Sequence, residues 1–207
     1  MRAPRKEGRR GWIQDGLEGS LQCIAFRMRD AKGDFLRYPS IPMSNESIDV
    51  LMVCTGNICR SPTAEVVLRR KAQERGVGRR LEVDSAGTQA YHAGEGADPR
   101  TVECGTRRGY DFSSHRARRV TRADFEAYDW ILAMDHSHLE ALERLSYPGQ
   151  RARLAMFLEP VEKIHGLEVP DPYYGGPMGF ERVLDMCEDA CKGWLDRWFP
   201  PSQGKGS

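Results

Sequence analysis

The chain has 207 residues, of which 40% are hydrophobic and 9% aromatic, a composition that allows one domain with one buried core. Its longest apolar runs, VLMVC and WILAM, are far shorter than the roughly 20 residues of a membrane-spanning helix, so we expect no membrane partner. Six scattered cysteines without a signal peptide favour a reducing, cytoplasmic compartment over a disulfide-bonded secreted fold. Because no C-x2-C spacing is present, we expect neither a metal nor another cofactor.

The net charge of +1 is unevenly distributed along the chain. Residues 1–42 carry nine Lys or Arg against five Asp or Glu, and they contain five glycines, three prolines and no sustained hydrophobic period. We therefore expect residues 1–42 to be a disordered extension, and MSNESIDVLMVC looks like a natural start at Met43. A basic arm or a transit peptide fits the acidic residues and glycines poorly, so we expect no nucleic-acid partner. The folded domain is expected at residues 43–207.

From Ile48 onward, strand-like and helix-like segments alternate, which is typical of an α/β domain with a parallel sheet. No internal repeat interrupts this alternation. In chain order we expect a strand at 48–54, a helix at 61–76, a strand at 80–88, a helix at 97–109, a short helix at 121–128, a strand at 129–135, a helix at 137–145, a strand at 152–158 and a long amphipathic helix at 179–199.

The stretch VCTGNICRSP joins the first of these strands to the first helix. A loop in this position points its backbone N–H groups inward, and the helix start adds partial positive charge, so the stretch predicts an anion site. Gly56 and Asn57 tolerate the left-handed backbone that a tight cradle needs. Such a cradle favours the nucleophilic thiolate of Cys54. Arg60 can fold back as a planar fork over phosphate oxygens, and Ser61 can donate a hydrogen bond to the thiolate.

The spacing C-x5-R alone is a weak signal, because it occurs three times in this chain, beginning at Cys54, Cys23 and Cys191. The occurrence at Cys23 lacks glycine and lies in the N-terminal extension. The one at Cys191 lies inside the predicted closing helix, where the N–H groups are already bonded. Only the occurrence at Cys54 follows a strand and opens a helix. The alternative interpretation of Cys54 is a buried structural cysteine.

Together, the motifs VCTGNICRSP, DSAGT and DPYY resemble the low-molecular-weight protein tyrosine phosphatases, over the chain from about Ile48 to Phe199. The resemblance implies a four-stranded parallel sheet of order 2-1-3-4 flanked by helices, a flavodoxin-like three-layer sandwich. It places the site at the carboxyl end of the first strand, as is usual for open α/β sheets. It also implies a phosphatase that acts on tyrosine-phosphorylated proteins and aryl phosphates, as a monomer with weak self-association at most.

The resemblance implies that Cys54 is the nucleophile that becomes phosphocysteine, that Arg60 binds the phosphoryl oxygens, and that Asp171 is the general acid. Asp171 lies in EVPDPYYGGPMG, a Pro- and Gly-rich part of a connection of about twenty residues, and loops of that length are usually functional or disordered. The Asp-Pro pair alone is only a turn signal. The role of Asp171 therefore depends on the presence of Cys54.

Further residues match positions that bind substrate or support the loop in this family. Asn57 with Ser85 and His115 matches a hydrogen-bond network that holds the loop in shape, although His115 beside RARR can also be read as a surface histidine. Tyr91, Tyr173 and Tyr174 match aromatic residues at the site entrance, with ordinary packing as the alternative. The residues expected to contact substrate are Thr55, Gly56, Asn57, Ile58, Cys59, Ser61, Tyr91, Tyr173 and Tyr174.

Two enzymatic alternatives share this loop. Relatives that remove phosphate from arginine carry threonine where this chain has Ile58, so the isoleucine favours phosphotyrosine. Thioredoxin-linked arsenate reductases need two further relay cysteines, whereas Cys104 is expected to have no partner nearby, and Cys187 and Cys191 are expected in the core. A non-catalytic phosphate-binding module is the third alternative, and the presence of both a nucleophile and a general acid argues against it.

The family resemblance also suggests a reversible disulfide between Cys54 and Cys59, two thiols within one phosphate-sized turn. The alternative is that Cys59 only packs inward. Mass spectrometry after mild peroxide treatment should detect a Cys54–Cys59 bond rather than an over-oxidised Cys54. A sulfonic acid on Cys54 with Cys59 still reduced would rule out this protection.

Overall fold

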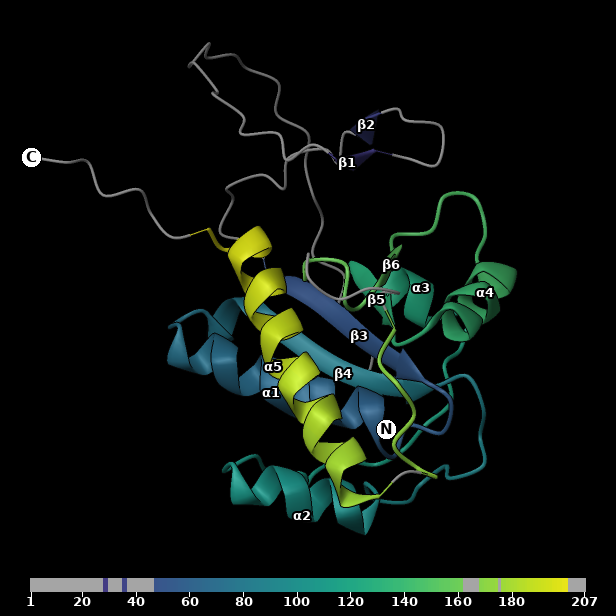
Figure 1. The fold of residues 1–207 in the computed structure, drawn as a ribbon. Coiled ribbons are helices and arrows are strands. Elements are labelled where there is room, and N and C mark those ends of the chain that lie inside the picture. Colours follow the sequence, from purple (N-terminus) through teal and green to yellow (C-terminus); the bar gives the residue numbers. More distant parts are fainter. Residues whose placement is uncertain (1–27, 30–34, 37–46, 162–167, 175, 201–207) are drawn as a thin grey trace, which may run out of the picture. The chain divides into compact units, whose positions relative to one another are not determined.

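The structure is a computed structural model, which describes residues 28–29, 35–36, 47–161, 168–174 and 176–200 (Figure 1). It divides into two units, Met1–Met43 and Ser44–Ser207. In the first unit, the strands β1 (Met28–Arg29) and β2 (Phe35–Leu36) form an antiparallel pair. The remainder of the predicted disordered extension lies outside the described residues.

The second unit is built on a four-stranded parallel sheet of order β4-β3-β5-β6, which confirms the predicted order 2-1-3-4. The strands are β3 (Ile48–Cys54), β4 (Leu81–Gly87), β5 (Trp130–Ala133) and β6 (Arg153–Met156). All seven residues of the central strand β3 are buried, because helices cover both faces of the sheet.

Six helices accompany the sheet in the described part of the second unit. They are α1 (Arg60–Glu74), the 3-10 turn η1 (Gly78–Arg80), α2 (Pro99–Arg107), α3 (Asp124–Ala127), α4 (His136–Leu145) and α5 (Pro177–Trp198). Figure 1 shows α1 and α5 side by side on one face of the sheet, with α3 and α4 on the other. Alternate residues of β3 point to the two faces, and Leu51 and Val53 pack with Phe125 and Leu142 of α3 and α4.

The boundaries agree with the sequence prediction to within two residues, except at the short helix expected over residues 121–128, which is reduced to Asp124–Ala127. The 3-10 turn η1 was not predicted. The Asp124 carboxylate accepts hydrogen bonds from the backbone N–H and the hydroxyl of Thr121, at 2.7 and 3.1 Å. These bonds hold residues 121–123 in a turn instead of a helical conformation, since short polar side chains compete for backbone groups.

The closing helix α5 is attached to the sheet through a cluster of tryptophans. The ring centroids of Trp194 and Trp198 are 4.9 Å apart, and that of Trp194 lies 5.2 Å from that of Trp130 in β5. Trp194 is fully buried, and its indole N–H donates to the carbonyl oxygen of Phe157 at 2.7 Å. Since Phe157 directly follows β6, this contact also fixes the beginning of the long connection to α5.

Replacing this buried ring should destabilise the whole domain. We expect Trp194→Ala to lower the free energy of unfolding by about 3–5 kcal/mol, because it leaves a large cavity and an unpaired carbonyl. Urea unfolding followed by circular dichroism measures this loss. The control Met178→Ala removes a side chain that is 79% exposed and should change stability by less than about 0.5 kcal/mol. Equal urea midpoints for Trp194→Ala and Met178→Ala would contradict the role of the buried tryptophan ring in stability.

Candidate active site

The candidate nucleophile lies where β3 ends and the connection to α1 begins. Cys54 is 3% exposed, and its Sγ lies 3.0 Å from Ser61 Oγ in the first turn of α1. The backbone N–H of Asn57 donates to the same sulfur at 3.3 Å. The structure therefore places Cys54 and Ser61 in the contact expected from the sequence, at the N-terminus of a helix where partial positive charge collects.

The backbone of the loop differs from the expectation at one of its two predicted left-handed positions. Asn57 has a φ of +58°, whereas Gly56 has no positive φ. A Cβ atom at Gly56 would lie 3.1 Å from Cδ2 of His92, and one at Gly87 would lie 2.6 Å from the carbonyl oxygen of Thr55. These two glycines therefore provide space for the loop, and Asn57 alone supplies the left-handed turn.

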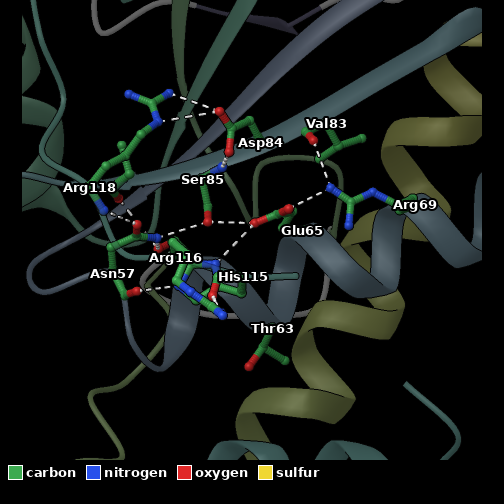
Figure 2. A network of polar contacts seen from close by, with 12 residues as sticks. Asn57, Thr63, Glu65, Arg69, Val83, Asp84, Ser85, His115, Arg116 and Arg118 are labelled. Atoms are coloured by element: carbon green, nitrogen blue, oxygen red, sulfur yellow. Dashed lines mark hydrogen bonds and ion pairs between the residues drawn. The ribbon is translucent and has the colours of Figure 1, made fainter. Parts of the chain in front are cut away.

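The side chain of Asn57 ties the loop to three separate segments (Figure 2). Its amide nitrogen donates to Ser85 Oγ on β4 at 2.8 Å and to Ser61 Oγ at 3.0 Å. Its amide oxygen accepts from the backbone N–H of Arg118 at 2.9 Å. His115 is 6% exposed, so it is not a surface histidine, and its Nε2 lies 2.8 Å from the carbonyl oxygen of Asn57.

Sequence reasoning missed Glu65, a buried carboxylate of α1 that lies behind this network. Ser85 Oγ donates to its Oε2 at 2.6 Å, and His115 Nδ1 lies 3.6 Å from the same oxygen (Figure 2). Burial would raise the pKa of Glu65, but the nearby His115 ring, the hydrogen bond from Ser85 and the charge of Arg69 together hold the pKa below its ordinary value. Glu65 lies within a predicted amphipathic helix, so the sequence did not indicate that it supports the loop from inside the domain.

The guanidinium of Arg60 is buried and forms ion pairs with two carboxylates, those of Asp135 and Asp171. Its Nη1 donates to Asp135 Oδ2 at 2.8 Å, and its Nη2 donates to Asp171 Oδ2 at 2.8 Å. Its Nη2 also lies 3.2 Å from Thr55 Oγ1. The structure thus brings Asp171 to Arg60, although 111 positions separate them. Sequence reasoning missed Asp135, whose position directly after a buried strand was the available signal.

The side chain of Asp171 is 45% exposed, and its Oδ1 accepts the backbone N–H of Tyr173 at 3.0 Å. Tyr173 is 39% exposed, Tyr174 is 94% exposed, and their rings meet edge to face with centroids 5.0 Å apart. Tyr91 is 76% exposed. None of these three rings is packed in the core, so ordinary packing does not explain them.

Arg100, near the start of α2, connects this tyrosine segment to the Cys54 loop. Its Nη1 donates to the carbonyl oxygen of Tyr173 at 3.0 Å, and its guanidinium lies 5.1 Å from the centroid of the Tyr173 ring. It also pairs with Asp98 at 2.8 Å, and the backbone N–H of Asp98 donates to the carbonyl oxygen of Ile58 at 2.9 Å. The segment after Asp171 is therefore held by residues that also contact the loop.

The five cysteines that the structure describes, Cys54, Cys59, Cys104, Cys187 and Cys191, are all buried and free. Cys187 and Cys191 lie in the core face of α5 as predicted. Cys59 and Cys104 line the same small cavity with Thr101. The hydrogen bond from Asp98 to Ile58 brings α2 against the start of α1, which the sequence did not reveal.

Cys59 packs inward and is 6% exposed. Burial raises its pKa to about 12, so it is a neutral thiol. The disulfide with Cys54 stays a prediction.

Membrane insertion and metal binding each need a feature that can be looked for in the described residues. Within them, no helix combines the length and hydropathy needed to cross a membrane. In the same part of the chain, no three His, Cys, Asp or Glu side chains are grouped as they would be around a metal ion.

The depressed pKa of Glu65 predicts a pH-dependent contribution to stability. Ionised Glu65 stabilises the fold above its ordinary pKa of 4.5, and this stabilisation is lost as pH falls through the lower folded-state pKa. We expect Glu65→Gln to be less stable than the wild type at about pH 7, with the difference shrinking towards about pH 3. Urea unfolding across this range tests the prediction, with Glu74→Gln at the exposed end of α1 as control. A pH-independent difference would contradict it.

Residues 49–199 match the family described as low molecular weight phosphotyrosine protein phosphatase. A low molecular weight protein-tyrosine-phosphatase of Streptomyces coelicolor is 47% identical over 150 residues, covering 70% of this chain and 90% of the relative. The crystal structure of a protein tyrosine phosphatase from Entamoeba histolytica is 39% identical with a TM-score of 0.70, covering 73% of this chain and 97% of that one.

A Drosophila arginine phosphatase structure is 28% identical with the same TM-score of 0.70, covering 73% of this chain and 98% of that one. Fold, loop motif and relatives agree, and the chain belongs to the low-molecular-weight protein tyrosine phosphatase family.

Proposed function

We propose that the chain hydrolyses phosphotyrosine in proteins, and aryl phosphates in general, through a phosphocysteine intermediate on Cys54. The observation that carries this proposal is that Asp171, from a distant part of the chain, meets the loop that contains Cys54 and Arg60. Cys54 lies at the N-terminus of α1 in contact with Ser61, and Arg60 of the same loop pairs with Asp171. A nucleophile, an oxyanion-binding fork and an acid therefore share one site.

In the first step, the Cys54 thiolate attacks phosphorus in line with the leaving oxygen, so an S–P bond forms as the P–O bond breaks. Backbone N–H groups of the loop and the guanidinium of Arg60 stabilise the charge on the equatorial oxygens. The contacts of Sγ with Ser61 Oγ and the Asn57 N–H supply hydrogen bonds that favour the thiolate.

In the same step, Asp171 gives its proton to the leaving oxygen, and in the second step its carboxylate takes a proton from the water that attacks phosphocysteine. The half-exposed Asp171 contacts Arg60 through Oδ2. A dianionic phosphoryl group competes for the same guanidinium nitrogen, because both ligands are oxygen anions. We infer that the substrate displaces Asp171 from Arg60 and leaves its carboxyl facing the leaving oxygen.

Three features favour phosphotyrosine over other phosphate esters and amides. The phenolate of tyrosine has a pKa near 10 and is a far better leaving group than the alkoxide of serine. The exposed rings of Tyr91, Tyr173 and Tyr174 can stack on a substrate ring. Ile58, in place of the threonine of phosphoarginine-specific relatives, supports the same choice.

The proposed site uses residues of one chain, which supports a monomer acting on tyrosine-phosphorylated proteins. We also propose a cytoplasmic location, because a nucleophilic thiol stays reduced there.

The decisive experiment is hydrolysis of p-nitrophenyl phosphate and phosphopeptides by the full chain in the presence of a metal chelator. We expect Cys54→Ser to abolish turnover, and Asp171→Asn to slow phosphotyrosine-peptide hydrolysis by roughly 10²–10⁴. The matched control Asp111→Asn changes an exposed carboxylate and should leave the rate unchanged. Phosphoserine and phosphoarginine peptides should react far more slowly than phosphotyrosine.

If the wild type binds phosphate without turnover, the loop is a binding cradle and the proposal fails. Faster reaction with phosphoarginine would instead assign the arginine phosphatase activity. Arsenate reduction with thioredoxin would support the reductase alternative.

A further inference from the structure

Four side chains, Arg60, Asp135, His138 and Thr55, form a closed ring of polar contacts. Of these, His138 has no part in the chemistry described above. Arg60 contacts Asp135 through Nη1 at 2.8 Å and Thr55 through Nη2 at 3.2 Å. His138 closes the ring, because its Nε2 lies 2.8 Å from Thr55 Oγ1 and its Nδ1 lies 2.9 Å from Asp135 Oδ1. The side chain of His138 is 2% exposed.

The local sequence explains why these groups meet. Asp135 follows β5 and caps the N-terminus of α4, with its Oδ1 accepting the backbone N–H of His138 at 2.9 Å. The same carboxylate therefore uses one oxygen for the helix and the other for Arg60. Burial opposes ionisation of Asp135, but the nearby His138 ring and the hydrogen bonds from the Ser137 hydroxyl and the His138 backbone N–H hold its pKa well below the ordinary value.

The donors and acceptors of these contacts are mutually consistent when Nε2 of His138 accepts a hydrogen bond and Nδ1 carries a proton. Arg60 donates to Thr55 Oγ1, and the Thr55 hydroxyl still has its own proton for Nε2 of His138. The N–H at Nδ1 then faces the Asp135 carboxylate, at ion-pair distance although outside hydrogen-bond alignment. Each polar group close to the guanidinium thus has a defined orientation.

We propose that His138 is a positioning residue that holds the guanidinium of Arg60 in its phosphate-binding orientation through Thr55 and Asp135. The inference rests on the proposed function of Arg60. When a phosphoryl group displaces Asp171, Arg60 loses one of its two carboxylate contacts, and the contacts with Asp135 and Thr55 remain to orient the fork. An orientation error matters most in the transition state, where the equatorial oxygens carry the developing charge.

The test compares three replacements of His138 in the full chain. His138→Ala removes both contacts, His138→Gln can place an amide near Nε2 to keep the contact with Thr55, and His138→Asn can place one near Nδ1 to keep the contact with Asp135. His136→Ala, an exposed histidine two positions away on the same helix, is the matched control. The readouts are kcat and KM for p-nitrophenyl phosphate, inhibition constants for orthovanadate and phosphate, and thermal stability.

We expect His138→Ala to lower kcat roughly tenfold with a smaller change in KM, the size of one lost hydrogen bond. Orthovanadate bound to a thiolate takes the five-coordinate geometry of the transition state, so its affinity should fall by a similar factor, and that of phosphate by less. The Gln and Asn variants should each recover part of the loss, and His136→Ala should behave as the wild type.

Wild-type kcat and vanadate affinity in His138→Ala would overturn the inference. The inference would also be overturned if the loss of kcat in all three variants followed only the loss of thermal stability, while the ratio of vanadate to phosphate affinity stayed unchanged. If His138→Ala does not fold, the Gln and Asn variants decide the question by the same ratio. The inhibitor affinities do not require turnover, so an inactive wild type would refute the proposed function and still allow this inference to be tested.

Discussion

The site depends on one turn of backbone, the passage from β3 into α1 between Cys54 and Arg60. This turn requires a left-handed residue, and Asn57 supplies it with a φ of +58°. Asparagine tolerates this conformation at little cost and, unlike glycine, has a side chain that can hold the turn in place. Its amide does so by bonding to Ser85 and to the backbone of Arg118. The loop shape is therefore specified by contacts from elements distant in the chain.

The second constraint is the burial of Arg60, whose side chain is 5% exposed. A buried guanidinium is tolerated only when its charge and donors are matched. Asp135, which follows β5, and Asp171, in the connection from β6 to α5, provide that match. Parallel strands bring their carboxyl ends to one edge, which places Asp135. The connection carries Asp171 back to the same edge, where the Val169 N–H donates to the carbonyl oxygen of Met134. The carboxylates that balance the charge of buried Arg60 therefore also bring the proposed general acid, Asp171, to the site.

The polar residues around the loop fall into a buried group and an exposed group. Glu65, Ser85 and His115 contact the loop from inside the domain and are buried. Asp171 is half-exposed, and Tyr173 and Tyr174 are exposed. In the proposed function, the buried contacts hold the loop around Cys54, and Asp171 leaves Arg60 when a substrate binds. Such a division suits catalysis, which needs a preorganised site and an open approach.

The alternation of elements and the residues around Cys54 could be read from the amino-acid sequence, and the family resemblance implied the strand order. These features are local, or they follow from hydrophobic period and motif spacing, which a single sequence records directly. Packing in three dimensions added the contact of Asp135 with Arg60, the contacts of His138 with Asp135 and Thr55, and the hydrogen bond from Ser85 to Glu65. Most of these contacts join residues far apart in sequence, and a carboxylate or histidine within a helical pattern has no local signal that distinguishes it from a solvated one. Their roles were decided by how the chain packs.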